Sequence, residues 1–155
     1  MKFYTSYFYQ IRFFPKNLIP LSTACYDPKW YHDNKGQKYQ FFDKRNVING
    51  IRIEPFVPGP ECNNLCYGPE YCNDKPPTCI FLCQYKIQLN KLDKNDILVR
   101  FDKLADKLKT TLNLDDVDFA LIFHESPTRA CSERWIVQQW FKENDLEISE
   151  WITKK

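Results

Sequence analysis

The chain has 155 residues, a mass of 18.6 kDa and a formal net charge of +2, which is the size of one ordinary domain. Hydrophobic residues make up 43% and charged residues 27%, so the composition excludes a disordered or collagen-like chain. No run of 18 apolar residues is present, and the first residues lack the uninterrupted apolar segment of a signal peptide. We therefore expect a single cytoplasmic domain, residues 1–155.

The first third of the chain predicts short strands. Bulky and small side chains alternate over residues 2–8, which is typical of a strand. Pro15 and Pro20 bracket the start of a second short strand within residues 16–24, and residues 51–53 are candidates for another.

The composition changes over residues 55–77, which contain six prolines, two glycines and three of the seven cysteines. Proline lacks the backbone donor that helices and central strands need, so this segment is predicted to be a loop. A loop of this length in a small domain needs something to hold it in place.

Two helices are expected after the loop. The first begins at Cys79, and its apolar side is predicted to run through Ile80, Cys83 and Ile87. The second follows Asp93 and carries an amphipathic stripe formed by Ile97, Phe101, Leu104 and Leu108.

The last third predicts a strand, a helix and a strand. Residues 117–123 are an almost continuous apolar run, which is typical of a strand buried on both faces. A polar loop leads into a helix that carries Trp135, Ile136, Trp140 and Phe141, and residues 146–151 alternate like an edge strand. The order of elements predicts an α/β domain, with a mostly parallel sheet flanked by helices and a cysteine- and proline-rich loop insertion.

Five of the seven cysteines lie within residues 62–83. Four thiolates at about 2.3 Å form a closed tetrahedral zinc site, which is structural because it leaves no position for water. An iron–sulfur cluster is less well matched by the spacing, and disulfides or unrelated thiols are the other interpretations. We therefore expect residues 55–83 to be a zinc-binding loop, with ligands drawn from Cys62, Cys66, Cys72, Cys79 and Cys83.

The loop before the last helix is a candidate site. Ligands of open α/β sheets bind beyond the carboxyl ends of strands, and a helix N-terminus attracts anions. Arg129 and Arg134 would strengthen that attraction. The alternative is that Ser126-Pro127 simply begins the helix, with proline at its first position.

The same loop contains the candidate catalytic groups. Cys131 near a helix start can have a lowered pKa and act as a thiolate. His124 and Glu125 can then serve as a base and the group that orients it. The competing interpretation is that Cys131 lies more than one turn inside the helix and only packs there.

Positive charge and aromatic residues are concentrated at the start of the chain. Residues 1–52 hold nine Lys and Arg against three Asp, together with 13 of the 25 aromatic residues. Interleaved basic and aromatic side chains suit stacking on bases and neutralising phosphates, although they also suit a core with a solvated rim. The candidate ligand contacts are Arg12, Lys29, Trp30, Arg129 and Arg134.

Two stretches of the chain resemble the domain of unknown function 488 family. The first is carried by Thr5-Ser6-Tyr7-Phe8, by residues 14–22 and by Pro28-Lys29-Trp30-Tyr31. The second consists of Ala120-Leu121-Ile122, Glu125-Ser126-Pro127 and Cys131, and residues 89–93 resemble the family's central helix joint. The resemblance covers residues 1–31 and 89–141. It implies a compact cytoplasmic α/β domain with a pocket between the loops of the N-terminal strands and the last helix, and it implies no established reaction.

The chain departs from that family at three places. Phe123 stands where the family commonly has a second cysteine, and Ser132 and Glu133 replace the His and Arg expected after Cys131. The segment 55–85 is elaborated. If the family's Cys-His-Arg group contacts a ligand, this chain has an altered version of it.

Taken together, the sequence predicts a zinc-stabilised α/β protein that binds a nucleotide or a nucleic-acid phosphate. One alternative is an enzyme that acts on a nucleotide or base through Cys131 or through His124 and Glu125. Another is a protein-interaction module that uses exposed aromatic residues. No membrane association is expected.

Overall fold

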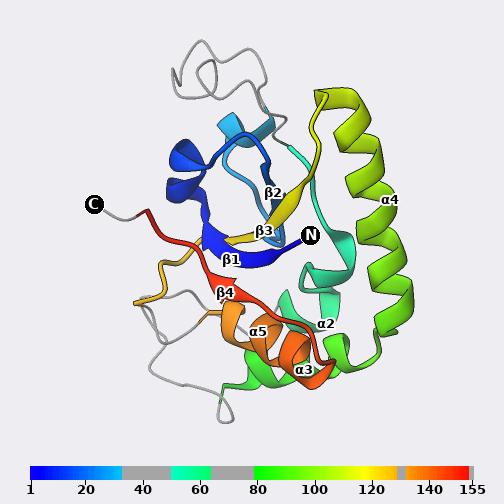
Figure 1. Ribbon diagram of the computed structural model, residues 1–155. Coiled ribbons are helices and arrows are strands. Elements are labelled where there is room, and N and C mark those ends of the chain that lie inside the picture. Colours follow the sequence, from blue (N-terminus) through cyan, green and yellow to red (C-terminus); the bar gives the residue numbers. More distant parts are fainter. Residues whose placement is uncertain (33–49, 64–78, 129–131, 154–155) are drawn as a thin grey trace.

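The computed structural model describes residues 1–32, 50–63, 79–128 and 132–153. These residues form a four-stranded sheet in the order β2-β3-β1-β4, and every pairing in it is parallel (Figure 1). The predicted α/β class with a parallel sheet and flanking helices is confirmed. The strands are β1 (Phe3–Tyr7), β2 (Leu18–Ser22), β3 (Asp118–Phe123) and β4 (Ser149–Glu150).

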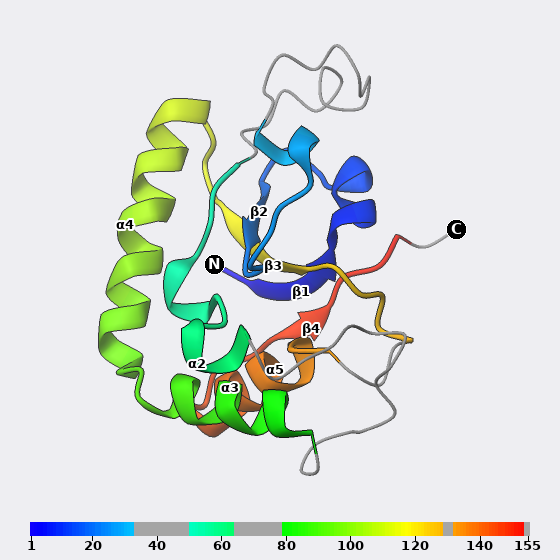
Figure 2. The same cartoon turned by 180° about the vertical axis from the view of Figure 1, so that it is seen from behind.

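The two faces of the sheet are covered differently. Three α-helices pack against one face, where Phe119, Leu121 and Phe123 of β3 enter the larger core (Figure 2). Ala120 and Ile122, which alternate with them, enter a smaller core on the other face. That face is covered by two 3-10 helices, η1 (Phe8–Phe13) and η2 (Lys29–His32), and the helices of the first face are α3 (Ile80–Asn90), α4 (Lys94–Leu112) and α5 (Arg134–Glu143).

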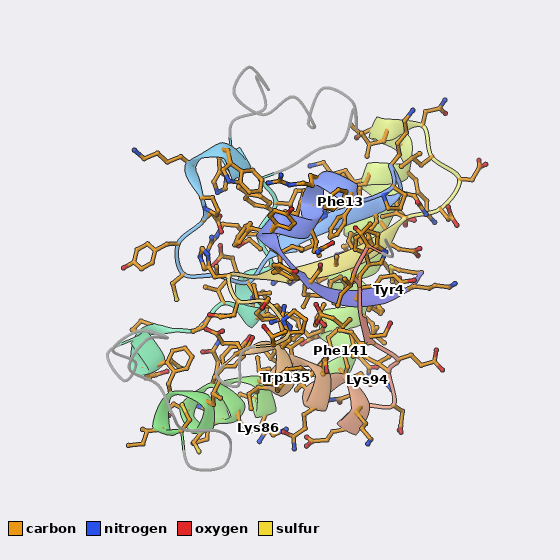
Figure 3. All side chains as sticks on the ribbon, turned by 90° about the vertical axis from the view of Figure 1, so that its left-hand side faces the viewer. Tyr4, Phe13, Lys86, Lys94, Trp135 and Phe141 are labelled. Carbon is orange, nitrogen blue, oxygen red and sulfur yellow. The ribbon has the colours of Figure 1, made fainter. Side chains whose placement is uncertain are left out.

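The side chains show the same division. Phe13 of η1 lies on one side of the sheet, and Trp135 and Phe141 of α5 lie on the other (Figure 3). The alternation of the strand residues explains this arrangement, because successive side chains of a strand point to opposite faces. Alternate residues of each strand therefore face the α-helices on one side of the sheet and the 3-10 helices on the other.

The second predicted helix is confirmed as α4. Asp93 caps its N-terminus by accepting a hydrogen bond from the Asp96 backbone N–H at 3.0 Å. Asn113 ends it in the left-handed region, with φ at 54°. Its buried residues are Ile97, Phe101, Ala105 and Leu108, which agrees with the predicted stripe except that Leu104 is only partly buried.

The apolar side predicted for α3 is wrong. Ile80 and Ile87 are 65% and 49% exposed, because the helix turns its larger side chains toward the sheet and α5. Aromatic and leucine side chains bury more area than the two isoleucines, so they decide which face packs. The buried residues of α3 are Phe81, Leu82, Tyr85 and Leu89.

The predicted strand at residues 51–53 is reduced to one bridge beside β2. The Ser22 backbone N–H donates to Ile51 O at 2.9 Å, and the Ile53 N–H donates to Ser22 O at 3.0 Å. The predicted edge strand at residues 146–151 is likewise only the two residues of β4.

The described part of the 55–83 loop contains two single helical turns, η3 (Glu54–Phe56) and α2 (Pro60–Asn63), where only irregular backbone was predicted. Gln88 of α3 holds this segment, since its Oε1 accepts from the Gly59 N–H at 2.8 Å and its Nε2 donates to Val57 O at 2.7 Å. Among the helices that the structure describes, none is long and apolar enough to cross a membrane.

Candidate functional site at the carboxyl ends of the strands

A small pocket of about 120 Å³ lies at the carboxyl ends of β2 and β3. Parallel α/β sheets bind ligands at this edge because the loops that follow neighbouring strands converge there. The pocket is formed by the residues after β2, the residues after β3 and the residue that precedes α5. Its lining residues are Thr23, Ala24, Cys25, Tyr26, Phe123, His124, Glu125 and Glu133.

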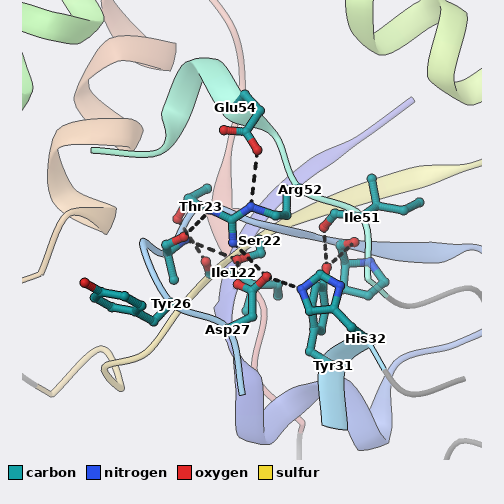
Figure 4. A network of polar contacts seen from close by, with 12 residues as sticks. Ser22, Thr23, Tyr26, Asp27, Tyr31, His32, Ile51, Arg52, Glu54 and Ile122 are labelled. Atoms are coloured by element: carbon teal, nitrogen blue, oxygen red, sulfur yellow. Dashed lines mark hydrogen bonds and ion pairs between the residues drawn. The ribbon is translucent and has the colours of Figure 1, made fainter. Parts of the chain in front are cut away.

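A polar network holds the loop after β2 in place (Figure 4). The Asp27 carboxylate accepts hydrogen bonds from Arg52 Nη1 at 2.7 Å, from the Ser22 hydroxyl and from His32 Nε2 at 2.6 Å. The same guanidinium donates to Ala24 O at 2.7 Å. Burial alone would raise the pKa of Asp27, but these hydrogen bonds outweigh it and lower that pKa. The loop that forms one wall of the pocket is therefore fixed.

Two glutamates face each other in the pocket. Burial, followed by the charge of Glu125, raises the pKa of Glu133 to about 7. Glu125 itself is the second residue after β3, and its Oε2 accepts from the Ser132 hydroxyl at 3.3 Å. With this raised pKa, Glu133 is protonated part of the time at neutral pH. The pair thus offers one hydrogen-bond donor together with acceptors.

Cys25, Tyr26 and His124 complete the mouth of the pocket. Burial raises the pKa of the Cys25 thiol, whose Sγ lies 3.6 Å from Pro58 O, so the thiol form predominates at neutral pH. Tyr26 is 83% exposed, while its backbone carbonyl hydrogen-bonds the His124 ring. That ring also lies 4.8 Å from the Phe8 ring.

Arg134 has a positioning role beside the pocket. Its side chain is fully buried, and Nε donates to a Glu150 carboxylate oxygen at 2.9 Å. Nη1 donates to Glu125 O at 2.7 Å and to the Ser132 hydroxyl at 3.2 Å. Nη2 donates to Ser6 O at 3.2 Å and to the other Glu150 oxygen at 3.4 Å. All five guanidinium donors have protein acceptors, so a bound phosphate would have to displace one of them.

The alternative interpretation, in which the last helix starts at Ser126-Pro127, is wrong. Helix α5 begins at Arg134, with Glu133 as its N-cap residue, rather than at Ser126-Pro127. Thr128, Ser132 and Glu133 lie outside any helix, and Glu133 lines the pocket. The predicted contact Arg129 and the candidate nucleophile Cys131 lie outside the described residues.

The other predicted ligand contacts lie on the 3-10 helices. Arg12 is exposed on η1, and its guanidinium carbon lies 4.2 Å from the centre of the Tyr9 ring. Lys29 is exposed on η2. Trp30 is half-buried, and its ring centre lies 6.0 Å from that of Phe8. These helices follow β1 and β2, so they border the same edge of the sheet as the pocket.

The three described cysteines of the predicted zinc loop lie at different positions in and around α3. Cys79 precedes the helix and Cys83 lies one turn inside it, whereas the Cys62 Sγ lies 3.7 Å from Gln88 Oε1. Among the residues that the structure describes, no three His, Cys, Asp or Glu side chains are grouped to hold a metal ion. Cys66 and Cys72 lie outside those residues.

A larger hollow of about 800 Å³ opens at the amino end of β1, beside β4. Its ionisable groups, Lys2, Lys142, Asp145 and Glu147, are all exposed on its rim. Because these groups are solvated and of mixed sign, the smaller pocket is the better candidate site.

Sequence reasoning identified Glu125 and His124 but missed Cys25 and Glu133. The signal for Cys25 was the run of small and polar residues, Ser22 to Cys25, directly after a buried strand. Glu133 was missed because the last helix was expected to begin near or before Cys131, which would have placed Glu133 inside the helix. Comparison of the chain with protein-family models, curated proteins and solved structures finds no match, so the family resemblance stays a prediction.

Proposed function

We propose that the carboxyl edge of the sheet binds a nucleotide, with its base in the pocket and its phosphate outside. The observation that carries this proposal is the pair of facing carboxyl groups, Glu125 and Glu133, in a pocket of about 120 Å³. Pockets for drug-sized ligands span roughly 300–1,000 Å³. A hollow of the smaller size suits one planar ring rather than a whole nucleotide.

The chemistry of the pair matches the edge of a nucleobase. A base presents amino and ring N–H donors beside carbonyl and ring-nitrogen acceptors. A carboxylate accepts from the donors, and the protonated carboxyl donates to an acceptor. Enzymes that read an extruded base use hydrogen bonds of this kind together with stacking on aromatic side chains, and Tyr26 presents an exposed ring at the pocket mouth.

The phosphate would contact basic residues around the edge of the sheet. Arg12 on η1 and Lys29 on η2 are both exposed there, whereas the donors of Arg134 already bind protein acceptors. In this arrangement the phosphate binds outside the pocket that contains the two glutamates. The glutamates would recognise the base, and the basic residues would bind the phosphate.

A nucleotide-binding assay tests the proposal. At low salt, where phosphate contacts are strongest, nucleoside monophosphates should bind the wild-type protein. Glu133→Met should weaken binding about 5- to 150-fold, because loss of a good pair of base contacts is worth ~1–3 kcal/mol. Glu133→Gln should retain most of the affinity, since the amide keeps a donor and an acceptor.

The matched control is Glu147→Met, which changes an exposed glutamate in the larger hollow. It should leave the affinity unchanged. Absence of binding for every nucleoside monophosphate at low salt, or equal affinity for wild type and Glu133→Met, would refute the proposed function.

Acid–base catalysis on the bound base is a second candidate function. The pKa of Glu133, about 7, lets one carboxyl hold or release a proton at neutral pH, as a general acid or base must. His124 lines the same pocket. Cys25 is not a suitable nucleophile there because its pKa is raised, and Cys131 stays the other candidate for that role.

A structural zinc site in the 55–83 loop is also part of the proposal. Cys79 and Cys83 lie one helical turn apart and so share a face of α3. Cys62 packs at Gln88, about 7.5 Å further along the helix axis than Cys83. The thiolates best suited to join Cys79 and Cys83 are therefore Cys66 and Cys72, which lie outside the described residues.

Elemental analysis combined with a thiol titration tests the zinc site. We expect about one zinc per chain, with several thiols that react only after chelation. Cys83→Ser should abolish zinc binding, whereas Cys62→Ser, the control, should keep it. Metal-free protein with fully reactive thiols would contradict the zinc site and leave the nucleotide proposal standing.

A further inference from the structure

The outer face of η1 presents two aromatic rings and a guanidinium to solvent. Tyr9 is 54% and Phe13 is 45% exposed, and their ring centres are 6.0 Å apart. The Arg12 guanidinium lies 4.2 Å from the centre of the Tyr9 ring, and its Nε donates to Tyr9 O at 3.1 Å. We call Tyr9, Arg12 and Phe13 the η1 platform. The other face of η1 is buried through Phe8 and Ile11, so the platform is held on a fixed base.

The helix that carries the η1 platform adjoins the pocket, because the ring of its first residue, Phe8, lies 4.8 Å from the ring of His124, which lines the pocket. The Tyr9 ring lies 6.4 Å from the Tyr7 ring and almost parallel to it. The Tyr7 ring lies 5.9 Å from the Arg134 guanidinium carbon, and that guanidinium donates to the backbone carbonyl of Glu125. The aromatic residues on and beside η1 therefore lie close to the residues that form the pocket.

The charge around the platform favours a polyanion. Residues 1–32 contain four exposed Lys and Arg residues. Arg12 on η1 and Lys29 on η2 lie at the carboxyl edge of the sheet, whereas Lys2 and Lys16 precede β1 and β2 at its amino edge. The one acidic residue in this segment, Asp27, has a side chain that is 3% exposed and is bound by Arg52 and His32. The 3-10 helices thus present two cations at this edge, and residues 1–32 contribute no exposed carboxylate side chain there.

Exposed rings beside basic side chains are the features with which proteins bind single-stranded nucleic acid, whose bases are free to stack. We infer that the protein binds single-stranded nucleic acid, with one base in the pocket and a neighbouring base stacked on the η1 platform. This inference rests on the proposed function, and it names the substrate as a strand rather than a free nucleotide. A duplex would not fit, because its bases are already paired and stacked.

Fluorescence anisotropy with a short labelled single strand of mixed sequence, as DNA and as RNA, tests the inference. At low salt the strand should bind at least about tenfold more tightly than a nucleoside monophosphate, because each stacked base and each phosphate contact adds affinity. Tyr9→Ala and Phe13→Ala should each weaken strand binding about tenfold. Phe13→Ala should leave monophosphate binding unchanged, because Phe13 does not line the pocket. Tyr9→Ala removes the ring on which the Arg12 guanidinium lies, so Phe13→Ala is the variant that separates strand binding from monophosphate binding.

Ile87→Ala is the control, since Ile87 is similarly exposed at 49% but lies on α3. It should leave strand binding unchanged. If monophosphates bind as proposed while the strand binds no more tightly, or if Tyr9→Ala and Phe13→Ala have no effect, this inference fails and the proposed function stands. If neither monophosphate nor strand binds, both fail. Binding of a duplex as tight as that of the single strand would also overturn the inference.

Discussion

Replacing Arg134 with methionine is expected to lower the free energy of unfolding by about 3–5 kcal/mol, the cost of removing one partner of a buried ion pair. The guanidinium binds the end of β1 through Ser6 O, the loop after β3 through Glu125 O, and β4 through Glu150. Methionine fills a similar volume but leaves the carboxylate and both carbonyls without this donor. Urea unfolding followed by circular dichroism measures the loss.

Two further variants separate loss of this ion pair from a general effect of removing an arginine. Arg100→Met changes an exposed arginine on α4 and should shift stability by less than about 0.5 kcal/mol. Arg134→Met combined with Glu150→Gln should be less destabilised than Arg134→Met alone, because no unpaired carboxylate is left buried. If Arg134→Met loses no more stability than Arg100→Met, the buried contacts of Arg134 do not stabilise the fold as expected.

The stability of the wild-type protein is expected to fall as the pH rises from about 4.5 to about 7. Burial and the charge of Glu125 raise the pKa of Glu133 from 4.5 to about 7, so the folded state holds a proton that the unfolded state releases. Protonation therefore favours the folded state below this interval, and that contribution is lost through it. At ~1.4 kcal/mol per pKa unit, and allowing for partial solvent exposure, the loss is about 2–3 kcal/mol.

The variant Glu133→Gln isolates this effect, because glutamine does not titrate. It should match the wild type near pH 5 and exceed it by about 2 kcal/mol near pH 8. The measurement is the free energy of unfolding at several pH values in this range. Glu147→Gln, which changes an exposed glutamate, should keep the wild-type slope. If the free energy of unfolding depends on pH equally in Glu133→Gln and in the wild type, the pKa of Glu133 is not raised by folding.

The elements with strong local patterns were predictable. The apolar run ending at Phe123 forms an interior strand, and the spacing of Ile97, Phe101 and Leu108 forms the buried side of α4. The face of α3 was not predictable in the same way, because apolar side chains occur around most of that helix. Its orientation depends on contact with α5 and α2, which no local pattern reports.

The candidate site was only partly predictable for a related reason. Glu125 was found because it lies in the polar loop that begins after the most strongly predicted strand. Cys25 and Glu133 also line the pocket, but they are more than 100 residues apart in the sequence. Only the folded structure brings them together. Arg134 looked like a ligand contact because an arginine near a helix start attracts anions, and only the tertiary structure shows that Glu150 and three backbone or hydroxyl oxygens occupy it.

The interior position of β1 has a consequence for synthesis and folding. Its described partners come late in the chain, with Phe3 paired to Phe119 and Thr5 to Glu150. Such distant pairings form slowly, because the long intervening loop must close first. Residues 3–11 contain no charge, proline or glycine and are rich in aromatic residues, which is the composition of an aggregation-prone segment. A ribosome-bound chain that has not reached β3 therefore leaves this segment exposed to solvent, and assembly of the sheet is the step that buries it.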